Sequence, residues 1–444
     1  MFKVFSMFDG VSGFIVGLEK ANDKLGKRMF DVTHSNQYEP SRKSQDAYWV
    51  GVHNYPSISH SNADIMTVPD SYFEDMKEAG VNFIVGGFPC QDYSVARSKK
   101  DEKGLEGKKG VLFWEIIRAV KIIQPEYLIL ENVDRLLKSP SFQRGRDFGV
   151  MLAAFHQLGY GLEWRVVNSA EYGYPQKRKR VFCFIFKLSN TPFLPKKLEH
   201  LDFEAYIFNN SVLNTAFPIS KGQFYKGRMS INTLSTESIC NSDYVLNVSN
   251  HFKSDMFNTG LMINGKYLSL DAISETAPQT TLGDVISACK DYYVREYGQK
   301  AYEQYIESHT IRDLEKVDKF KYLRGSKRIE RIAENGHKWI YSEGAMSETD
   351  ELNLPARTML TSEGSVNRST HFIKTEDSYR TLLPIEAEIL QGFPFDFTKF
   401  KAHPCGKVDL VSERMRMFFM GNALVTDVVA DIAYTLGKKL QPTK

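Results

Sequence analysis

The sequence has few cysteines, no long apolar run and almost no excess of charge of one sign. Its five cysteines are scattered and form no CxxC pair, which argues against a metal or redox motif and favours reduced thiols in a cytosolic protein. The apolar N-terminus reaches Asp9 too soon for a signal sequence, and no later stretch is long and apolar enough to cross a bilayer. Because the net charge is only +3, any surface that binds nucleic acid must be local.

The chain also lacks internal repeats, low-complexity runs and zinc-finger spacing. What it has is 444 residues with 42% hydrophobic content, enough for a large core and two or three domains. Apolar runs with strand character alternate with a helical pattern, which predicts an α/β fold with a doubly wound, mostly parallel sheet. The predicted strands are Val4–Phe8, Asp31–Ser35, Phe83–Val85, Tyr127–Leu130 and Val181–Phe186.

The chain is organised around the stretch Phe83–Ser94, which reads FIVGGFPCQDYS. Its short strand is broken by two glycines, and Pro89 fixes the backbone immediately before Cys90. These flanks predict a thiol presented on a preset loop, where a ligand can approach closely. The alternative is a buried cysteine that acts as a small hydrophobe.

Polar side chains follow two other predicted strands. Glu131 ends the apolar strand Tyr127–Leu130, where ligands of open α/β sheets gather, although a helix cap or a buried ion pair is the alternative. Arg178 and Arg180 alternate into the strand Val181–Phe186, which predicts that they share one face. Paired arginines can hold a carbonyl, a phosphate or a catalytic carboxylate, while a solvated edge is the other interpretation.

A glycine turn, Asp9 to Gly13, joins the first strand to an apolar helix and predicts backbone N–H groups near a ligand. Its spacing lacks the full dinucleotide fingerprint, so NAD is not favoured. Gln37 and Asp64 follow later strands and are placed to line the same crevice; a solvated loop and a capping aspartate are the alternatives.

In this order the motifs resemble those of the DNA cytosine-5 methyltransferases of prokaryotic and phage type, which use S-adenosylmethionine. The resemblance covers roughly the first 190 and the last 90 residues, and so many motifs in family order are highly specific. They are FDGVSG (Phe8–Gly13), ADI (Ala63–Ile65), GGFPCQDYS (Gly86–Ser94), LFWEI (Leu112–Ile116), ENV (Glu131–Val133), YPQKRKRVF (Tyr174–Phe182), ARTML (Ala356–Leu360), YRTLLPIEAEILQGFP (Tyr379–Pro394) and MGNALV (Met420–Val425).

The resemblance implies the following chemistry. Cys90 supplies the thiolate that adds to carbon 6 of cytosine, because carbon 5 alone is too weak a nucleophile to take a methyl group. Glu131 and Arg180 meet the charge that spreads to nitrogen 3 and the exocyclic oxygen, with Arg178 in support. The target base is flipped out of the duplex, and Ser98 to Gly110 corresponds to the family's mobile active-site loop.

The resemblance also implies the cofactor contacts, with S-adenosylhomocysteine as the product and no metal. Gln37 stands where the family usually has an acid for the ribose, with Glu39 two residues further on, so the ribose contact is open. A helix at about Val425 to Leu436 is expected to fold back onto the N-terminal sheet. The remaining contacts are Phe8, Gly10 and Gly13 for the methionine part, Asp64 and Ile65 for the adenine, and Pro89, Leu112, Asn422 and Ala423 for the rest of the pocket.

We predict a catalytic and cofactor-binding domain at 1–190, a smaller target-recognition domain at 191–354, and a returning segment at 355–444. The stretch Lys316–Lys338 is rich in Lys and Arg, with Tyr322 and Trp339 close by, and is a candidate for phosphate contacts. A solvated helix face balanced by Glu330 and Glu334 is the alternative.

The predicted function is therefore sequence-specific DNA (cytosine-5-)-methyltransferase activity on double-stranded DNA. We expect a cytoplasmic monomer with no membrane partner, and a cognate restriction endonuclease as a functional partner or an orphan or phage-borne role. One alternative is the related RNA cytosine methyltransferase, whose middle region is usually much smaller. Another is a DNA-binding protein that has lost catalysis, which intact Cys90, Glu131 and Arg180 argue against.

Overall fold

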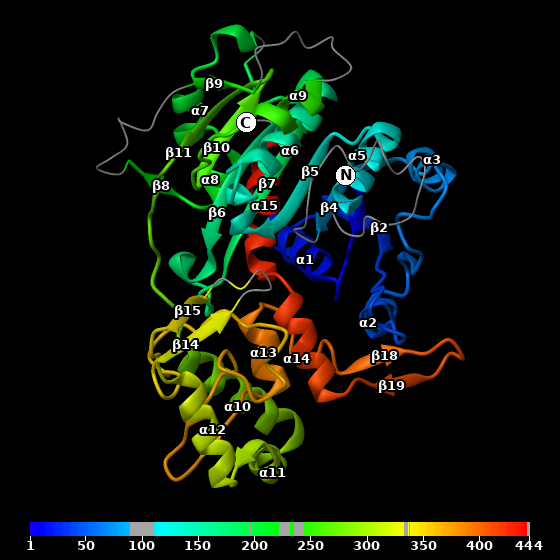
Figure 1. The fold of residues 1–444 in the computed structure, drawn as a ribbon. Helices are drawn as coiled ribbons and strands as arrows, with labels where there is room; N and C mark the ends of the chain where they lie inside the picture. The colour runs from blue at the N-terminus through cyan, green and yellow to red at the C-terminus, as the bar shows by residue number, and fades with distance from the viewer. Residues whose placement is uncertain are drawn as a thin grey trace. The chain divides into compact units, whose positions relative to one another are not determined.

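The computed structural model describes residues 1–88, 111–195, 197–221, 231–234, 244–332, 336 and 338–441. These residues divide into two compact units (Figure 1). Unit 1 consists of Met1–Tyr172, Lys179–Ala277 and Thr426–Lys444, and unit 2 of Gly173–Arg178 and Pro278–Val425. Each unit is thus assembled from segments that lie far apart in the sequence.

Unit 1 is built on a mixed sheet that has ten strands in the described part of the chain, in the order β3-β2-β1-β4-β5-β7-β6-β10-β11-β9. Neighbours from β3 to β5 are parallel, and β7 runs antiparallel to both β5 and β6. The predicted α/β fold is confirmed. The strands are β1 (Phe2–Met7), β2 (Phe30–Asn36), β3 (Ser59–Ser61), β4 (Val81–Gly87), β5 (Tyr127–Val133), β6 (Tyr160–Asn168), β7 (Lys179–Lys187), β9 (Ile231–Thr233), β10 (Thr259–Ile263) and β11 (Lys266–Leu270), with β8 (Ile219–Ser220) and β12 (Ile273–Ser274) pairing separately.

Helices cover both faces of this sheet. Alternate strand side chains such as Ile84 and Leu128 pack into one core cluster with α5 and α6, while Gly87 faces Phe14 of α1 on the opposite face. α1 ends at Gly26, which takes the left-handed conformation that favours glycine. The helices are α1 (Gly13–Leu25), α2 (Asp46–Asn54), α3 (Ser71–Glu78), α5 (Val111–Ile123), α6 (Arg146–Gln157), α7 (Phe203–Asn209), α8 (Val212–Ala216), α9 (Tyr244–His251) and α15 (Thr426–Lys439).

The C-terminal helix α15 packs along α1, as the predicted return to the N-terminal sheet requires. Lys20 and Lys24 form ion pairs with Asp427 and Asp431 at 2.7 and 2.6 Å. Gly17 lets the two helices approach closely, because a Cβ there would lie 2.6 Å from the Cβ of Val429. The two ends of the chain therefore belong to one body.

The compact units do not follow the predicted boundaries at 190 and 354. The segment Lys179–Ala277 belongs to unit 1, since β10 pairs antiparallel with β6 and so continues the same sheet. Asn264 and Gly265 have φ of 52° and 74° and form the turn that joins β10 to β11. The segment 355–425 lies in unit 2. The assignment of target recognition to 191–354 stays a prediction.

Unit 2 combines helices with short antiparallel sheets. The stack of Phe320, Phe372 and Tyr379, with ring centroids 4.6 and 4.8 Å apart, forms part of its core. Within the described ranges no single helix is both long and apolar enough to span a membrane; α14 (Glu413–Asn422) and α15 reach that length and composition only together. The elements are α10 (Leu282–Tyr297), α11 (Gln299–His309), β13 (Thr310–Ile311), α12 (Leu314–Arg324), β14 (Lys327–Ile332), β15 (Lys338–Glu343), β16 (Ile373–Lys374), β17 (Tyr379–Arg380), α13 (Pro384–Leu390), β18 (Phe400–Ala402), β19 (Val408–Leu410) and α14 (Glu413–Asn422).

Candidate active site

The turn between β1 and α1 is held in a sparsely populated backbone conformation. Phe8, Gly10 and Ser12 have φ of 53°, 59° and 66°, which is costly for the two residues with side chains. The Gly10 N–H donates to Oε1 of Gln37 at 2.7 Å, and the Asp9 N–H donates to the carbonyl of Asn36 at 3.0 Å. The end of β2 thereby fixes the shape of the turn.

The Asp9 carboxylate braces the same turn from inside. It accepts hydrogen bonds from the hydroxyls of Ser6 at 2.5 Å and Ser12 at 2.8 Å, and the residue is only 6% exposed. Burial raises the pKa of Asp9, an effect that outweighs the lowering by the two serine hydroxyls. Asp9 is therefore a structural group of this turn.

Three predicted cofactor residues converge on one core cluster of unit 1. Ile65 belongs to the cluster at 3% exposure, and Phe8 and Leu112 pack against it while partly buried. Asp64 accepts a hydrogen bond from the Met66 N–H at 3.0 Å, so its carboxylate caps a turn. The oxygen of Gln37 is committed to Gly10, and a ribose contact by Gln37 stays a prediction.

The location of the turn suits a nucleoside cofactor. The strand order reverses between β1 and β4, and ligands of doubly wound sheets bind at the carboxyl ends of the strands beside such a switch point. At Gly10 an added Cβ would meet no atom within 4 Å, so the described residues leave open space directly above the turn. The residues present therefore fit S-adenosylmethionine.

Glu131 and Arg180 meet because of the register of β5 and β7. Val133 lies opposite Arg180, and Glu131 is two residues away on the same face. Nε of Arg180 lies 2.9 Å from Oε1 of Glu131, with the side chains 18% and 14% exposed. Gly87 makes room for this pair, because a Cβ there would lie 3.1 Å from Oε2 of Glu131.

The start of the cysteine loop is tied to the same strand. Nδ2 of the buried Asn132 donates to the carbonyl of Phe88 at 2.8 Å. Sequence reasoning noted Asn132 only as part of the ENV motif; its position beside Glu131 is the available signal. Pro89, Cys90 and the predicted loop from Ser98 to Gly110 lie outside the described residues.

Arg178 differs from Arg180 in its surroundings, although the sequence predicted that they share one face. β7 begins at Lys179, and Arg178 belongs to unit 2. The residue is 2% exposed, and its guanidinium donates to the carbonyls of Met359 at 2.9 Å and Gly421 at 3.2 Å. These bonds hold backbone segments together, so a catalytic contribution of Arg178 stays a prediction.

Gln176, Asn422 and Ala423 also lie in unit 2. Gln176 is fully buried and bonds both Leu390 and Met359, a structural role that sequence reasoning missed. α14 ends at Asn422, and the Ala423 N–H donates to the Phe419 carbonyl at 2.8 Å. The residue before Asn422 is Gly421, where only glycine fits, because an added Cβ would lie 2.4 Å from the backbone carbonyl carbon of Leu360.

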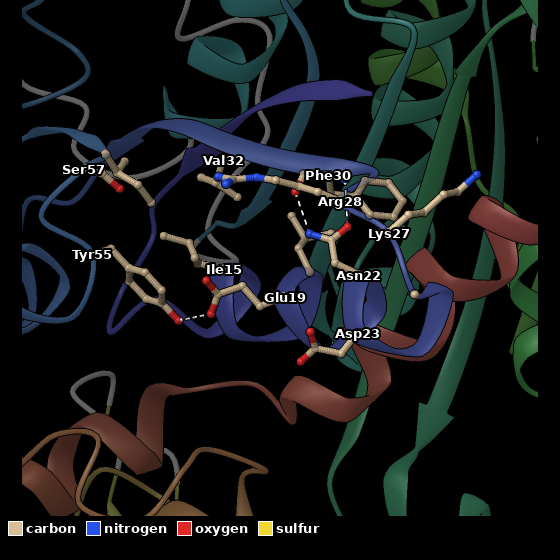
Figure 2. A pocket seen from close by; sticks show the side chains of 13 residues that line it. Ile15, Glu19, Asn22, Asp23, Lys27, Arg28, Phe30, Val32, Tyr55 and Ser57 are labelled. Carbon is tan, nitrogen blue, oxygen red and sulfur yellow. Dashed lines mark hydrogen bonds between the residues drawn. The ribbon is translucent and has the colours of Figure 1, made fainter.

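A cavity of about 690 Å³ lies elsewhere in unit 1, beside α1 and β2 (Figure 2). Glu19 accepts a hydrogen bond from the Tyr55 hydroxyl at 2.8 Å, and Asn22 donates to the Phe30 carbonyl at 2.8 Å. Since Phe30 begins β2, this cavity lies at the amino ends of the strands and is separate from the candidate site. No group of three or more potential metal ligands occurs within the described ranges.

Comparison with known proteins gives one consistent result. A family model described as C-5 cytosine-specific DNA methylase matches residues 2–438. The type II methyltransferase M.Sau3AI of Staphylococcus aureus is 45% identical over 437 residues, which is 98% of this chain and 95% of that protein. M.NgoBI of Neisseria gonorrhoeae is 30% identical over 193 residues, covering 44% of this chain and 53% of the relative.

Solved structures agree in fold. The S. pombe Dnmt2 methyltransferase aligns with a TM-score of 0.56 at 12% identity, and the Entamoeba histolytica methyltransferase EhMeth with 0.53 at 12% identity. Each alignment covers 99% of both chains. At this identity the likeness concerns the fold alone.

Proposed function

The chain belongs to the C-5 cytosine-specific DNA methylase family, and on that premise we propose that Cys90, Glu131 and Arg180 carry out its reaction on a cytosine flipped out of duplex DNA. The activity is that of a DNA (cytosine-5-)-methyltransferase. The observation that carries the proposed roles is the Glu131–Arg180 ion pair at the end of β5, beside the strand that leads to Cys90.

Cys90 acts as the nucleophile. Its thiolate adds to carbon 6, and the ring electrons move towards nitrogen 3 as the carbon–sulfur bond forms. Glu131 holds a proton at nitrogen 3, and Arg180 orients Glu131 and stabilises the charge that develops nearby. Once carbon 5 has been methylated, loss of its proton returns an electron pair to the ring and expels Cys90 as thiolate.

S-adenosylmethionine supplies the sulfonium methyl group that carbon 5 takes up, which leaves S-adenosylhomocysteine. The β1–α1 turn holds its methionine part, and the apolar surface that includes Ile65 receives its adenine. The open space above Gly10 supports this assignment. The residues that we assign to the cofactor are Phe8, Gly10, Gly13, Gln37, Asp64, Ile65, Pro89, Leu112, Asn422 and Ala423.

The substrate is a short specific sequence in double-stranded DNA, and the enzyme works as a cytoplasmic monomer within a restriction–modification system. The type II name of the relative at 45% identity supports this context, because that relative matches almost the whole chain. The functional partner in this role is a cognate endonuclease that cuts the unmethylated sequence.

Bisulfite sequencing of DNA from a methylation-deficient host tests the proposal. The wild-type chain is expected to modify cytosines within one short motif, and Cys90→Ala is expected to modify none, since the nucleophile is absent. Cys405→Ala is the matched control, because Cys405 is an exposed thiol on the β18–β19 hairpin and is expected to leave the pattern unchanged.

Trapping with 5-fluorocytosine DNA isolates the covalent step. Wild type and Cys405→Ala are expected to form a denaturation-resistant adduct that Cys90→Ala does not form. Soluble wild-type protein that leaves DNA unmodified would contradict the proposal. An adduct that persists in Cys90→Ala would assign the nucleophile to another residue.

A further inference from the structure

Strands β14 and β15 of unit 2 form an antiparallel hairpin (Figure 1). All twelve strand residues are exposed or partly exposed. Apolar side chains are among them: Ile332 is 66% exposed, Ile340 52% and Trp339 41%. Because an isolated two-stranded ribbon is marginally stable in water, such a surface is suited to a partner that covers it.

The base of the hairpin is nevertheless held firmly. Arg368 donates to the carbonyls of Leu323 and Gly325 at 3.0 Å before β14, and to the carbonyl of Gly344 after β15. The same guanidinium lies 3.3 Å from the Glu343 carboxylate. The partly exposed Arg368 thus joins the backbone at both ends of the ribbon and fixes where the ribbon leaves unit 2.

The ribbon carries a local excess of positive charge. Its strands contain four basic residues and two acidic ones, and both acids are engaged: Glu330 with Lys338 at 3.1 Å and Glu343 with Arg368. Within the described part of the chain, neither Arg328 nor Arg331 forms an ion pair with a carboxylate. For a protein whose net charge is only +3, this concentration selects a polyanion as the partner.

Arg331 is the oriented cation of this surface. It pairs across the ribbon with Trp339, and Tyr341 projects from the same face. The guanidinium carbon lies 4.2 Å from the centroid of the Tyr341 ring and 5.7 Å from that of Trp339. Contact with these two rings restricts the motion of the guanidinium, and a planar guanidinium is suited to bidentate recognition of a base edge.

We propose that the β14–β15 ribbon enters the major groove of the substrate duplex and that Arg331 reads the O6 and N7 edge of a guanine in the target sequence. The B-DNA major groove, about 12 Å wide, admits a two-stranded ribbon, and arginine pairs in two-point fashion with guanine. Lys327, Arg328 and Lys338 meet phosphates along the groove walls. This inference rests on the proposed function, because it takes the duplex substrate as given.

The experiment compares kcat/KM of three purified full-length proteins: wild type, Arg331→Ala and Arg331→Lys. The substrates are unmethylated duplexes that contain the target motif, and duplexes in which single bases of that motif are changed. Arg331→Ala is expected to lower kcat/KM on the motif roughly ten- to hundred-fold and to lose the preference at one guanine position. Arg331→Lys retains the charge and so recovers non-specific duplex binding, but not that preference. Circular dichroism verifies that each variant is folded.

Arg295→Ala is the matched control in the same unit. Arg295 is exposed on α10, and its guanidinium carbon lies 5.6 Å from the centroid of the Tyr292 ring. The substitution Arg295→Ala therefore removes a similar arginine–tyrosine contact, but away from the ribbon. It is expected to retain the wild-type kcat/KM and motif preference.

Three outcomes overturn the inference: an unchanged motif preference and DNA KM in Arg331→Ala, a loss that is equal on every duplex, or self-association of the chain that depends on Arg331 while duplex binding does not. Equilibrium binding of unreactive duplexes separates this test from the proposed function. If the wild-type chain methylates no DNA, the proposed function fails. If wild type and Arg331→Ala then also bind duplexes equally, the proposed role of the ribbon in DNA binding fails as well.

Discussion

At the scale of single residues, the pairing of Glu131 with Arg180 follows from strand register. The two side chains leave the same face of adjacent antiparallel strands, and Gly87 leaves that face unobstructed. Arg178 lies only two positions before Arg180, yet it is buried among backbone carbonyls of unit 2. Arg180 is therefore a proposed catalytic residue, whereas Arg178, two positions earlier in the sequence, has a structural role.

The variant Glu131→Gln tests this pair. An amide cannot transfer a proton to nitrogen 3 and loses the ionic contact with Arg180, so we expect kcat to fall by about 10²- to 10⁴-fold. Steady-state methyl transfer to the motif DNA measures the change. The control Asp427→Asn breaks the Lys20–Asp427 pair in the same unit and is expected to keep full activity. If Glu131→Gln kept the wild-type kcat, Glu131 would have no catalytic role.

At the scale of elements, contact between α1 and α15 joins the two ends of the chain. The contact depends on a small residue, since an added Cβ at Gly17 would lie 2.7 Å from the backbone oxygen of Thr426 as well as close to Val429. Backbone cannot move aside as a flexible side chain can. The close approach of these helices is thus the reason for glycine in mid-helix.

The variant Gly17→Ala measures this effect. Replacing glycine within a helix is by itself favourable by roughly 0.5–1 kcal/mol, but overpacking costs about 1–3 kcal/mol, so we expect a net loss of about 1–2 kcal/mol in unfolding free energy. Denaturant unfolding followed by tryptophan fluorescence reports it, since three of the four tryptophans lie in unit 1. Gly344→Ala is the control, because a Cβ there meets nothing within 4 Å. A stabilised Gly17→Ala protein would show that the helices separate freely.

At the scale of the whole molecule, each unit depends on long-range polar contacts as well as on its core. In unit 2, Asp350 joins two arginines from different segments: Arg324 at 2.6 Å and Arg357 at 2.5 Å. Burial by itself raises the pKa of Asp350, but the hydrogen bond from Arg357 and the neighbouring positive charges hold it well below the usual carboxyl range. The ionised form is therefore the one that stabilises the fold.

The variant Asp350→Asn is expected to lower the unfolding free energy by about 3–5 kcal/mol near neutral pH, because it leaves the buried Arg324 without its counter-charge. A depressed pKa contributes stability above the ordinary carboxyl value of 3.8 and loses it as the pH falls below that value. The difference between wild type and variant should then narrow only in strong acid, which denaturant unfolding at several pH values measures. Glu307→Gln, at an exposed pair with Arg312, is expected to change stability little. An Asp350→Asn difference that narrows already near neutral pH would contradict the assignment.

The sequence by itself determined the local features. Strand positions and the glycine turn from Asp9 to Gly13 follow from side-chain periodicity and backbone preference over short distances. The order of the motifs along the chain determined the family and, with it, the chemistry expected of Cys90 and Glu131. These properties need no knowledge of which segments meet.

Only the tertiary structure decided how those segments combine. The free edge of β6 receives β10, which extends the first unit well beyond residue 190, and the carbonyls of Met359 and Gly421 accept the hydrogen bonds of Arg178. The Gln37 oxygen accepts a hydrogen bond from the Gly10 N–H, a contact between two segments that are far apart in the sequence. These contacts join segments that are distant in sequence. A sequence pattern does not specify how such segments align with one another, so it cannot predict the contacts.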